Sequence, residues 1–287
     1  MTMPNQPFKS SLAAPFSFSQ SSLQDYSDCA RRFQLRYIEQ LQWPAIETAP
    51  VMENERRQIE GQQFHRMVQQ YLLGLPVEKI TFMADHSNSE NLSRWWHNFV
   101  DARTNSLANL DNRSYFPEQS LSAPIGKHRL LAKFDLIAIQ DGRASIYDWK
   151  TYHKRPKDER MTAHLQTKVY MSLLAKAGSQ FNQGQPIEAE QIDMVYWYAD
   201  FPSEPLKIAH NSKQDMRNWQ SINDLINEIS EKQSFPLTAD EGVCNFCRYR
   251  SFCERGSTAA QDTNEEYEAA AQTNWDVNLE QIQEIEF

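Results

Sequence analysis

One stretch, residues 129–170, constrains the fold of this 287-residue chain more than any other. It contains two apolar runs, residues 130–139 and 144–149, joined by the short segment Gln140-Asp141-Gly142-Arg143. An Asp-Gly pair between two apolar runs is typical of the turn of a β-hairpin. We therefore predict two antiparallel strands here.

Each apolar run carries an acidic residue, Asp135 in the first and Asp148 in the second, and a buried strand tolerates an acid only for a reason. Because side chains alternate along a strand, Asp148 and Lys150 should point to the same side. In the next helical segment, Gln166 and Tyr170 are four residues apart and should share one face. Two carboxylates, a lysine and a polar helix face that converge in this way are typical of a metal-dependent phosphodiesterase.

Each of these residues also has a structural alternative. Asp148 and Lys150 can form a surface ion pair at a strand end, as exposed acids and lysines often do. Asp135 can cap the hairpin, although it lies far inside its apolar run. Tyr170 can be an ordinary core residue.

Bulk composition argues against a membrane protein. Apolar residues make up 40% of the chain, and no apolar run approaches the roughly 20 residues that span a bilayer. The N-terminal residues MTMPNQPFKSSLAAPF lack the apolar centre of a signal peptide. We expect a cytoplasmic protein with no membrane partner.

The net charge of −9 argues at first sight against a nucleic-acid partner. However, eight of the 38 acidic residues follow Arg255, where no basic residue occurs, so the rest of the chain has 30 acidic and 29 basic residues. Local basic clusters decide contact with phosphate, although such clusters are commonly only solvated faces. The clusters are Arg31, Arg32 and Arg36; Lys127 and Arg129; Lys154, Arg155 and Lys157; and Arg248 and Arg250.

Apolar periodicity and turn residues predict an α/β sandwich with one mixed sheet. The expected helices cover about residues 19–37, 55–73, 90–110, 160–176 and 212–232, and the expected strands residues 115–123, 130–139, 144–149 and 191–198. Cys29 should lie inside the first helix, and Ile59 on the apolar face of the second. We expect a flexible leader (1–15), one domain (16–256) and an acidic tail (257–287).

Four cysteines are present, Cys29, Cys244, Cys247 and Cys253, and disulfides are rare in cytosolic proteins. Three close thiols plus one remote thiol favour an iron–sulfur cluster. Zinc, whose ligands usually come as two close pairs, and free thiols are the alternatives. A cluster would join Cys29 to Cys244 across 215 residues, which corresponds to about 5 kcal/mol of constraint on the unfolded chain if the disulfide relation applies.

A set of motifs spans residues 19–253 in a fixed order: Ser19-x-Ser21-x-Leu23-x-x-Tyr26-x-x-Cys29, Gly61-x-x-x-His65, Asp135, Asp148-Trp149-Lys150, Gln166-x-x-x-Tyr170 and the trio Cys244, Cys247 and Cys253. Together they resemble the RecB-like branch of the PD-(D/E)XK nuclease superfamily. More narrowly, they resemble its iron–sulfur members, the small exonucleases of CRISPR adaptation and the nuclease domain of AddB-type helicase–nucleases. The chain departs from this pattern at Ala132, where relatives often have glycine, and at Ala30, where they commonly have proline.

The resemblance implies a restriction-endonuclease-like sandwich whose central mixed sheet is flanked by helices and whose termini are tied by a 4Fe-4S cluster. It implies a DNA nuclease that depends on a divalent metal and acts as an exonuclease on single strands or DNA ends, in repair, recombination or CRISPR adaptation. The alternative is a non-catalytic iron–sulfur subunit that binds DNA in such a complex.

The resemblance also implies roles for individual residues. His65, Asp135 and Asp148 would bind Mg²⁺ or Mn²⁺, and a histidine ligand favours Mn²⁺. Without the resemblance, His65 beside an apolar helix face is an ordinary core histidine. Glu118, on the strand before Asp135, would position metal-bound water.

Three further residues would support the reaction. Lys150 would orient the attacking water or stabilise charge on the scissile phosphate. Gln166 and Tyr170 would hold the substrate or the surroundings of Lys150. Near the C-terminus, residues 274–287 mix acidic and apolar side chains, which predicts docking on a protein partner or mimicry of nucleic acid, with a plain solvated tail as the alternative.

Overall fold

The computed structural model describes residues 12–41, 49–107, 110, 113–245 and 247–256. Its internal contacts divide the chain into two compact units, which we describe separately. Unit 1 comprises Met1–Met52, Pro124–Arg129 and Ser221–Phe287, and unit 2 comprises Glu53–Ala123 and Leu130–Gln220. The acidic tail and residues 1–11 of the expected leader lie outside the described residues, and the expectation of one domain over residues 16–256 stays a prediction.

A mixed sheet forms the centre of unit 2. β3 and β4 are antiparallel, β4 and β5 are parallel, β5 and β6 are antiparallel, and β2 pairs with β3. This confirms the predicted α/β fold with a mixed sheet and helices. The strands are β2 (Ser114–Ile125), β3 (His128–Gln140), β4 (Arg143–Lys150), β5 (Ile192–Tyr198) and β6 (Phe201–Ala209).

The predicted hairpin is confirmed, with a tighter turn than expected. Gln140 pairs with Arg143, so only Asp141 and Gly142 lie in the turn. Both have positive φ, 50° and 74°, as a two-residue turn of this kind requires.

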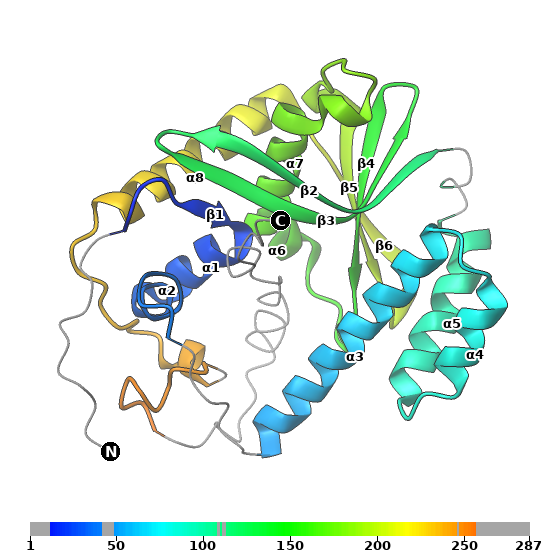
Figure 1. Ribbon diagram of the computed structural model, residues 1–287, viewed down its shortest axis with the longest axis horizontal. Helices are drawn as coiled ribbons and strands as arrows, with labels where there is room; N and C mark the ends of the chain where they lie inside the picture. The colour runs from blue at the N-terminus through cyan, green and yellow to red at the C-terminus, as the bar shows by residue number, and fades with distance from the viewer. Residues whose placement is uncertain (1–11, 42–48, 108–109, 111–112, 246, 257–287) are drawn as a thin grey trace, which may run out of the picture. The chain divides into compact units, whose positions relative to one another are not determined.

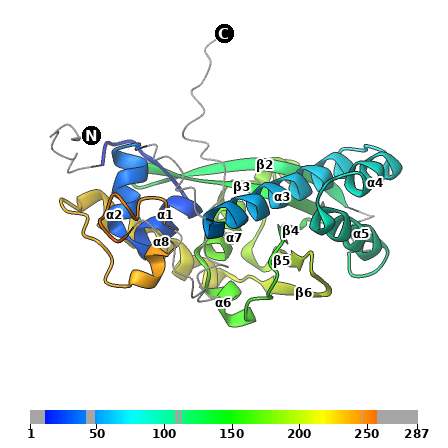
Figure 2. The same cartoon turned by 90° about the horizontal axis from the view of Figure 1, so that it is seen from below.

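Helices lie on the two opposite sides of β4 and β5 (Figures 1 and 2). On one side are α3 (Ala49–Leu72), α4 (Val77–Asp85) and α5 (Glu90–Thr104), whose core includes Phe64, Trp95 and Trp96 together with Trp149 of β4. On the other side is α7 (Leu165–Ala177). Strand alternation therefore turns Trp149 towards α3–α5 and its neighbours Asp148 and Lys150 away from them, as predicted.

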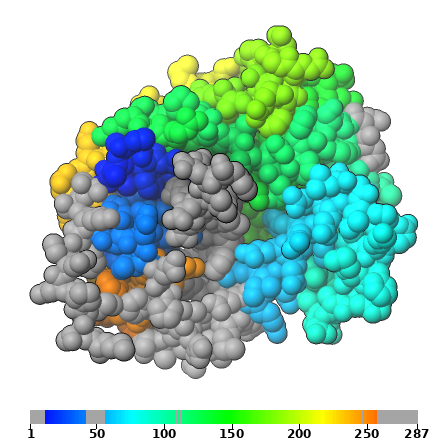
Figure 3. Space-filling model, in the orientation of Figure 1, coloured from blue at the N-terminus to red at the C-terminus, as the bar shows by residue number. Residues whose placement is uncertain are grey.

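These helices contribute surface to unit 2 (Figure 3, cyan). Two apolar side chains of α4 remain exposed: Phe82 and Met83 are 62% and 52% exposed, whereas Ile80 and Ala84 are buried. Ile59 of α3 is 54% exposed, so its predicted place on the buried face was wrong. Within the described ranges, no helix combines the length and apolar character that crossing a membrane requires.

The predicted helix over residues 160–176 is in fact two helices, α6 (Asp158–Ala163) and α7. They are separated by His164, whose backbone is extended (φ −63°, ψ 145°) and whose side chain accepts a hydrogen bond from the Gln166 amide. This cap places Gln166 in the first turn of α7. The sequence analysis also missed α4 and β6 and extended α5 too far, whereas α8 (Ser212–Glu231) matches its prediction.

Unit 1 begins with β1 (Ser17–Ser19) and α1 (Gln20–Asp28), and the Ser19 and Ser22 side chains form a capping box at the start of α1. The prediction of one helix through Cys29 was wrong. Cys29 has an extended backbone (φ −159°) and separates α1 from α2 (Ala30–Phe33), which continues into the π-helical turn η1 (Gln34–Ile38). The short helix η5 (Glu241–Cys244) ends at Cys244, the first of the other three cysteines.

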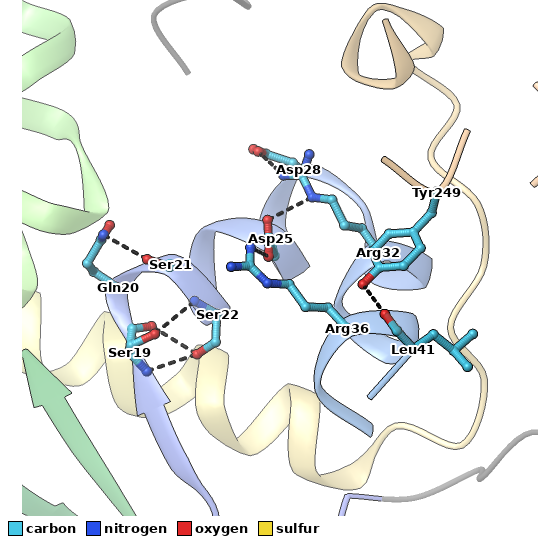
Figure 4. A network of polar contacts seen from close by, with 10 residues as sticks. All are labelled: Ser19, Gln20, Ser21, Ser22, Asp25, Asp28, Arg32, Arg36, Leu41 and Tyr249. Carbon is cyan, nitrogen blue, oxygen red and sulfur yellow. Dashed lines mark hydrogen bonds and ion pairs between the residues drawn. The ribbon is translucent and has the colours of Figure 1, made fainter. Parts of the chain in front are cut away.

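An ion network around a buried carboxylate joins α1, α2 and η1 (Figure 4). The Asp25 side chain is fully buried, with Oδ1 2.8 Å from Arg32 Nε and Oδ2 2.9 Å from Arg36 Nη1. Asp28 lies 2.5 Å from Arg32 as well. Arg32 and Arg36 are thus paired with carboxylates of α1, whereas Arg31, the third member of this basic cluster, donates a hydrogen bond to Gln34 Oε1. Phosphate binding by this cluster stays a prediction.

Candidate metal centre

Three possible metal ligands meet in unit 2. Donor atoms of His65 on α3, Glu118 on β2 and Asp135 on β3 all lie within 4.8 Å of one another, and each residue is partly exposed. His65 Nδ1 is 3.3 Å from Asp135 Oδ1, and the Trp149 amide donates to Asp135 Oδ2 at 2.9 Å. One Asp135 oxygen is thus fixed by the backbone of β4, while the other faces the histidine.

Gly61 explains how α3 brings His65 to this place. A Cβ atom at Gly61 would lie 3.1 Å from Thr151 Oγ1, just after the end of β4. Glycine therefore lets α3 approach the strand end closely. His65 follows one helical turn later, so the glycine–histidine spacing in the sequence reflects this approach.

Glu118 reaches the group through an unusual backbone conformation. Its φ is +54°, a region that non-glycine residues seldom adopt and that is often found at functional sites. Its Oε2 is 2.5 Å from Lys133 Nζ. The sequence analysis missed Lys133, whose signal was its position two residues before Asp135 on the same strand.

Asp148, Lys150 and Gln166 form a closed, buried triangle. Gln166 Nε2 donates to Asp148 Oδ1 at 2.7 Å, and Lys150 Nζ donates to Gln166 Oε1 at 2.9 Å. Lys150 Nζ is also 2.7 Å from Asp148 Oδ2. The structure thus brings these three predicted residues together, with α7 supplying the glutamine.

Tyr170, four residues after Gln166, contacts β3. Its hydroxyl donates to the Lys133 carbonyl at 2.7 Å, and its ring lies 4.7 Å from the Phe134 ring. Tyr170 therefore fixes the backbone of β3 beside the Glu118–Lys133 pair.

The charges of the site shift each other's pKa values. Burial, only partly offset by Lys150, raises the pKa of Asp148 to about 6. Burial would lower the pKa of His65, but the Asp135 carboxylate, with Asp148 and Glu118 adding to it, raises that pKa to about 9. Burial would raise the pKa of Asp135, but His65, the Trp149 amide and Lys150 together lower it.

The three clustered donors fit a divalent cation. Two carboxylates and an imidazole are ligands that Mg²⁺ or Mn²⁺ accepts, and their partial exposure leaves room for water as a further ligand. In the structure each acid of the site has its own cationic partner. The pairs are Asp135 with His65, Glu118 with Lys133, and Asp148 with Lys150.

The four cysteines all belong to unit 1. Cys29 is buried and the other three are partly exposed. Burial, followed by the nearby Cys29 thiol, raises the pKa of both Cys244 and Cys253. Burial raises the pKa of Cys247 to about 11, although Arg32 opposes this shift. The remote Cys29 is therefore within electrostatic range of the C-terminal group.

No curated protein matches this chain. Among solved structures, the protein SSO0001 is 12% identical, with 85% of this chain and 88% of that one covered and a TM-score of 0.36. A candidate exonuclease from Eubacterium rectale is 7% identical, with 74% and 79% covered and a TM-score of 0.47. Neither similarity bears on function at these values.

A family profile gives the decisive comparison. The profile of the PD-(D/E)XK nuclease superfamily matches residues 17–254, which include the clustered ligands, the Asp148–Lys150–Gln166 triangle and all four cysteines. The match covers most of the chain. The chain therefore belongs to the PD-(D/E)XK nuclease superfamily.

Proposed function

We propose that this protein is a divalent-metal-dependent DNA nuclease of the RecB-like branch, and that it acts as an exonuclease on single strands or DNA ends. The observation that carries the proposal is the neighbouring arrangement of two groups in unit 2. One is the ligand group of His65, Glu118 and Asp135, and the other is the triangle around Lys150. Membership in a nuclease superfamily supports this use of them.

The proposed ligands are His65, Glu118 and Asp135, with Asp148 as a fourth. Burial raises the pKa of Asp148, Lys150 opposes this shift, and the Asp135 carboxylate adds to it. The two aspartates are therefore within electrostatic range of each other. A bound Mg²⁺ or Mn²⁺ would activate water and neutralise charge that develops on the phosphate.

Lys150 is proposed to stabilise negative charge on the scissile phosphate. Its ammonium is held by Asp148 and Gln166, so it needs no rearrangement when the substrate binds. A donor that is already oriented stabilises developing charge better than a mobile one. Gln166 is therefore a positioning residue for both Asp148 and Lys150.

We propose further that Cys29, Cys244, Cys247 and Cys253 hold a 4Fe-4S cluster that ties the two ends of unit 1. The support is the arrangement of one remote thiol, Cys29, with three close ones, and the Cys29 thiol contributes to the raised pKa of Cys244 and Cys253. A zinc ion, whose ligands usually come as two close pairs, is the alternative. Iron and zinc analysis of anaerobically purified protein, beside Cys29→Ala, tests this.

The competing proposal is a non-catalytic iron–sulfur subunit that binds DNA in a repair or CRISPR-adaptation complex, with the acidic tail as the contact to a protein partner. The intact Asp148–Lys150–Gln166 triangle favours the enzyme, because a binding protein has no need of a buried carboxylate–lysine pair.

End-labelled single- and double-stranded DNA, incubated with Mg²⁺, Mn²⁺ or EDTA, tests the nuclease. We expect metal-dependent loss of terminal nucleotides that Asp148→Ala abolishes. Asp101→Ala, at an exposed position of α5, is the matched control and should cleave like the wild type. Cleavage in EDTA, or full activity in Asp148→Ala, would refute the mechanism.

A further inference from the structure

Lys133 differs from Lys150 in how firmly its ammonium group is held. The Lys150 side chain is 10% exposed and is bound by both Asp148 and Gln166. The Lys133 side chain is 35% exposed, and the structure pairs it with Glu118. Of the two site lysines, Lys133 is the one whose ammonium can move into solvent.

The backbone of Lys133 is fixed, so any such movement is confined to the side chain. Tyr170 donates to the Lys133 carbonyl at 2.7 Å and packs its ring against Phe134. Four methylene groups separate this anchored backbone from the ammonium nitrogen, which can therefore swing over several ångströms.

Glu118 faces both Lys133 and the other two clustered ligands. A divalent cation bound to His65, Glu118 and Asp135 would satisfy the Glu118 carboxylate and repel the lysine beside it. The cation and the Lys133 ammonium therefore compete for the same carboxylate.

We propose that a divalent cation displaces Lys133 from Glu118, and that the released ammonium then binds a phosphate of the nucleic-acid backbone. The inference rests on the proposed nuclease function and adds a substrate-binding residue to it. Without the cation, Lys133 is held by Glu118 and phosphate binding at this point is weak. Once the cation is bound, the ammonium is free for a phosphate, so cation and substrate bind cooperatively.

Cation affinity tests the first half of the proposal. Lys133→Met removes the competing charge but keeps much of the side-chain length, so Mn²⁺ should bind about threefold more tightly, the effect expected of a partly exposed ion pair. Lys133→Arg should bind like the wild type. The control is Lys207→Met on β6, where Lys207 Nζ lies 3.1 Å from Asp193, and it should leave the affinity unchanged. Mn²⁺ titration followed by electron paramagnetic resonance measures all four proteins.

The salt dependence of DNA binding tests the second half. The probe is a phosphorothioate single strand, which resists hydrolysis, and its Kd is measured over a range of salt concentrations. With Mn²⁺, Lys133→Met should bind more weakly, and the slope of log Kd against log salt should fall by about 0.7, the value of one phosphate contact. In EDTA the two slopes should agree, and Lys133→Arg should restore the wild-type slope.

Unchanged or weaker Mn²⁺ binding in Lys133→Met would overturn the inference, and so would equal slopes in Mn²⁺. Circular dichroism and urea unfolding establish that each variant is folded, and Lys133→Arg covers the case of a misfolded Met variant. A wild-type protein that binds no Mn²⁺ would remove the proposed function itself. A wild-type protein that binds and cleaves normally, next to an unaltered Met variant, would remove only the role of Lys133.

Discussion

The proton on His65 should compete with the metal for the clustered ligands. Burial would lower the pKa of His65, but Asp135 at 3.3 Å, with help from Asp148 and Glu118, raises it to about 9 in the metal-free protein. The ring is therefore protonated at neutral pH and must lose a proton before that nitrogen can bind a cation. The affinity for the cation should rise with pH until about 9 and then level off.

The size of the pH dependence of cation affinity follows from the displacement of one proton per bound cation. Below the pKa of His65, each pH unit changes the apparent affinity by a factor of about ten. Between pH 6 and the His65 pKa of about 9, the Kd for Mn²⁺ should therefore fall about a thousandfold. Below about pH 6 the dependence should steepen, because Asp148 then becomes protonated as well.

Calorimetry in two buffers with different ionisation enthalpies measures the proton directly. Near neutral pH we expect the release of about one proton per Mn²⁺ bound. His65→Asn should bind Mn²⁺ more weakly but with little pH dependence above pH 6. His97→Asn, on the exposed side of α5, should keep the wild-type slope. If the wild type releases no proton, or if His65→Asn keeps the slope, the reasoning is wrong.

Three further predictions concern stability and ligand placement. Asp25→Ala should lower the free energy of unfolding by about 3–5 kcal/mol, because it leaves two mostly buried guanidinium groups without their shared carboxylate. Asp28→Ala should lower it by at most about 1 kcal/mol. Urea unfolding measures both variants, and equal losses would contradict the prediction. Gly61→Val should push α3 away from the end of β4 and weaken Mn²⁺ binding in titrations, and unchanged affinity would show that the close approach is unnecessary. Tyr170→Phe should cost about 1 kcal/mol in urea unfolding through loss of one hydrogen bond, while a loss near zero would mean that β3 needs no such anchor.

The parts of the fold that the sequence predicted well depend on local periodicity. The hairpin of β3 and β4 follows from two apolar runs and an Asp-Gly turn. The separation of Asp148 and Lys150 from Trp149 follows from strand alternation alone. In contrast, the apolar repeat continues through Cys29 and His164, so it gave no sign that the backbone is extended at both. Such breaks depend on capping and tertiary contacts, which periodicity does not record.

Ion pairing was the least predictable feature of the site and its surroundings. Arg32 and Arg36 belong to a basic cluster in the sequence, but in the structure both pair with the buried carboxylate of Asp25. The pairing of Glu118 with Lys133 depends on a positive φ at Glu118, and glutamate is not a residue that marks such a conformation. Which charges meet is decided by tertiary geometry, so the motifs identified most of the candidate site but not this pair.

The three acid–cation pairs of the site differ in how readily they can be broken. Lys150 is nearly buried and held by Gln166, so it should stay with its carboxylate when a metal binds. His65 is 31% exposed and can lose its proton, and Lys133 is 35% exposed and can swing away. Binding of one divalent cation then adds two positive charges and displaces two, so the total charge of the site is preserved. This exchange requires the release of about one proton per cation rather than two, because the second positive charge leaves as the ammonium of Lys133 and remains available to a phosphate.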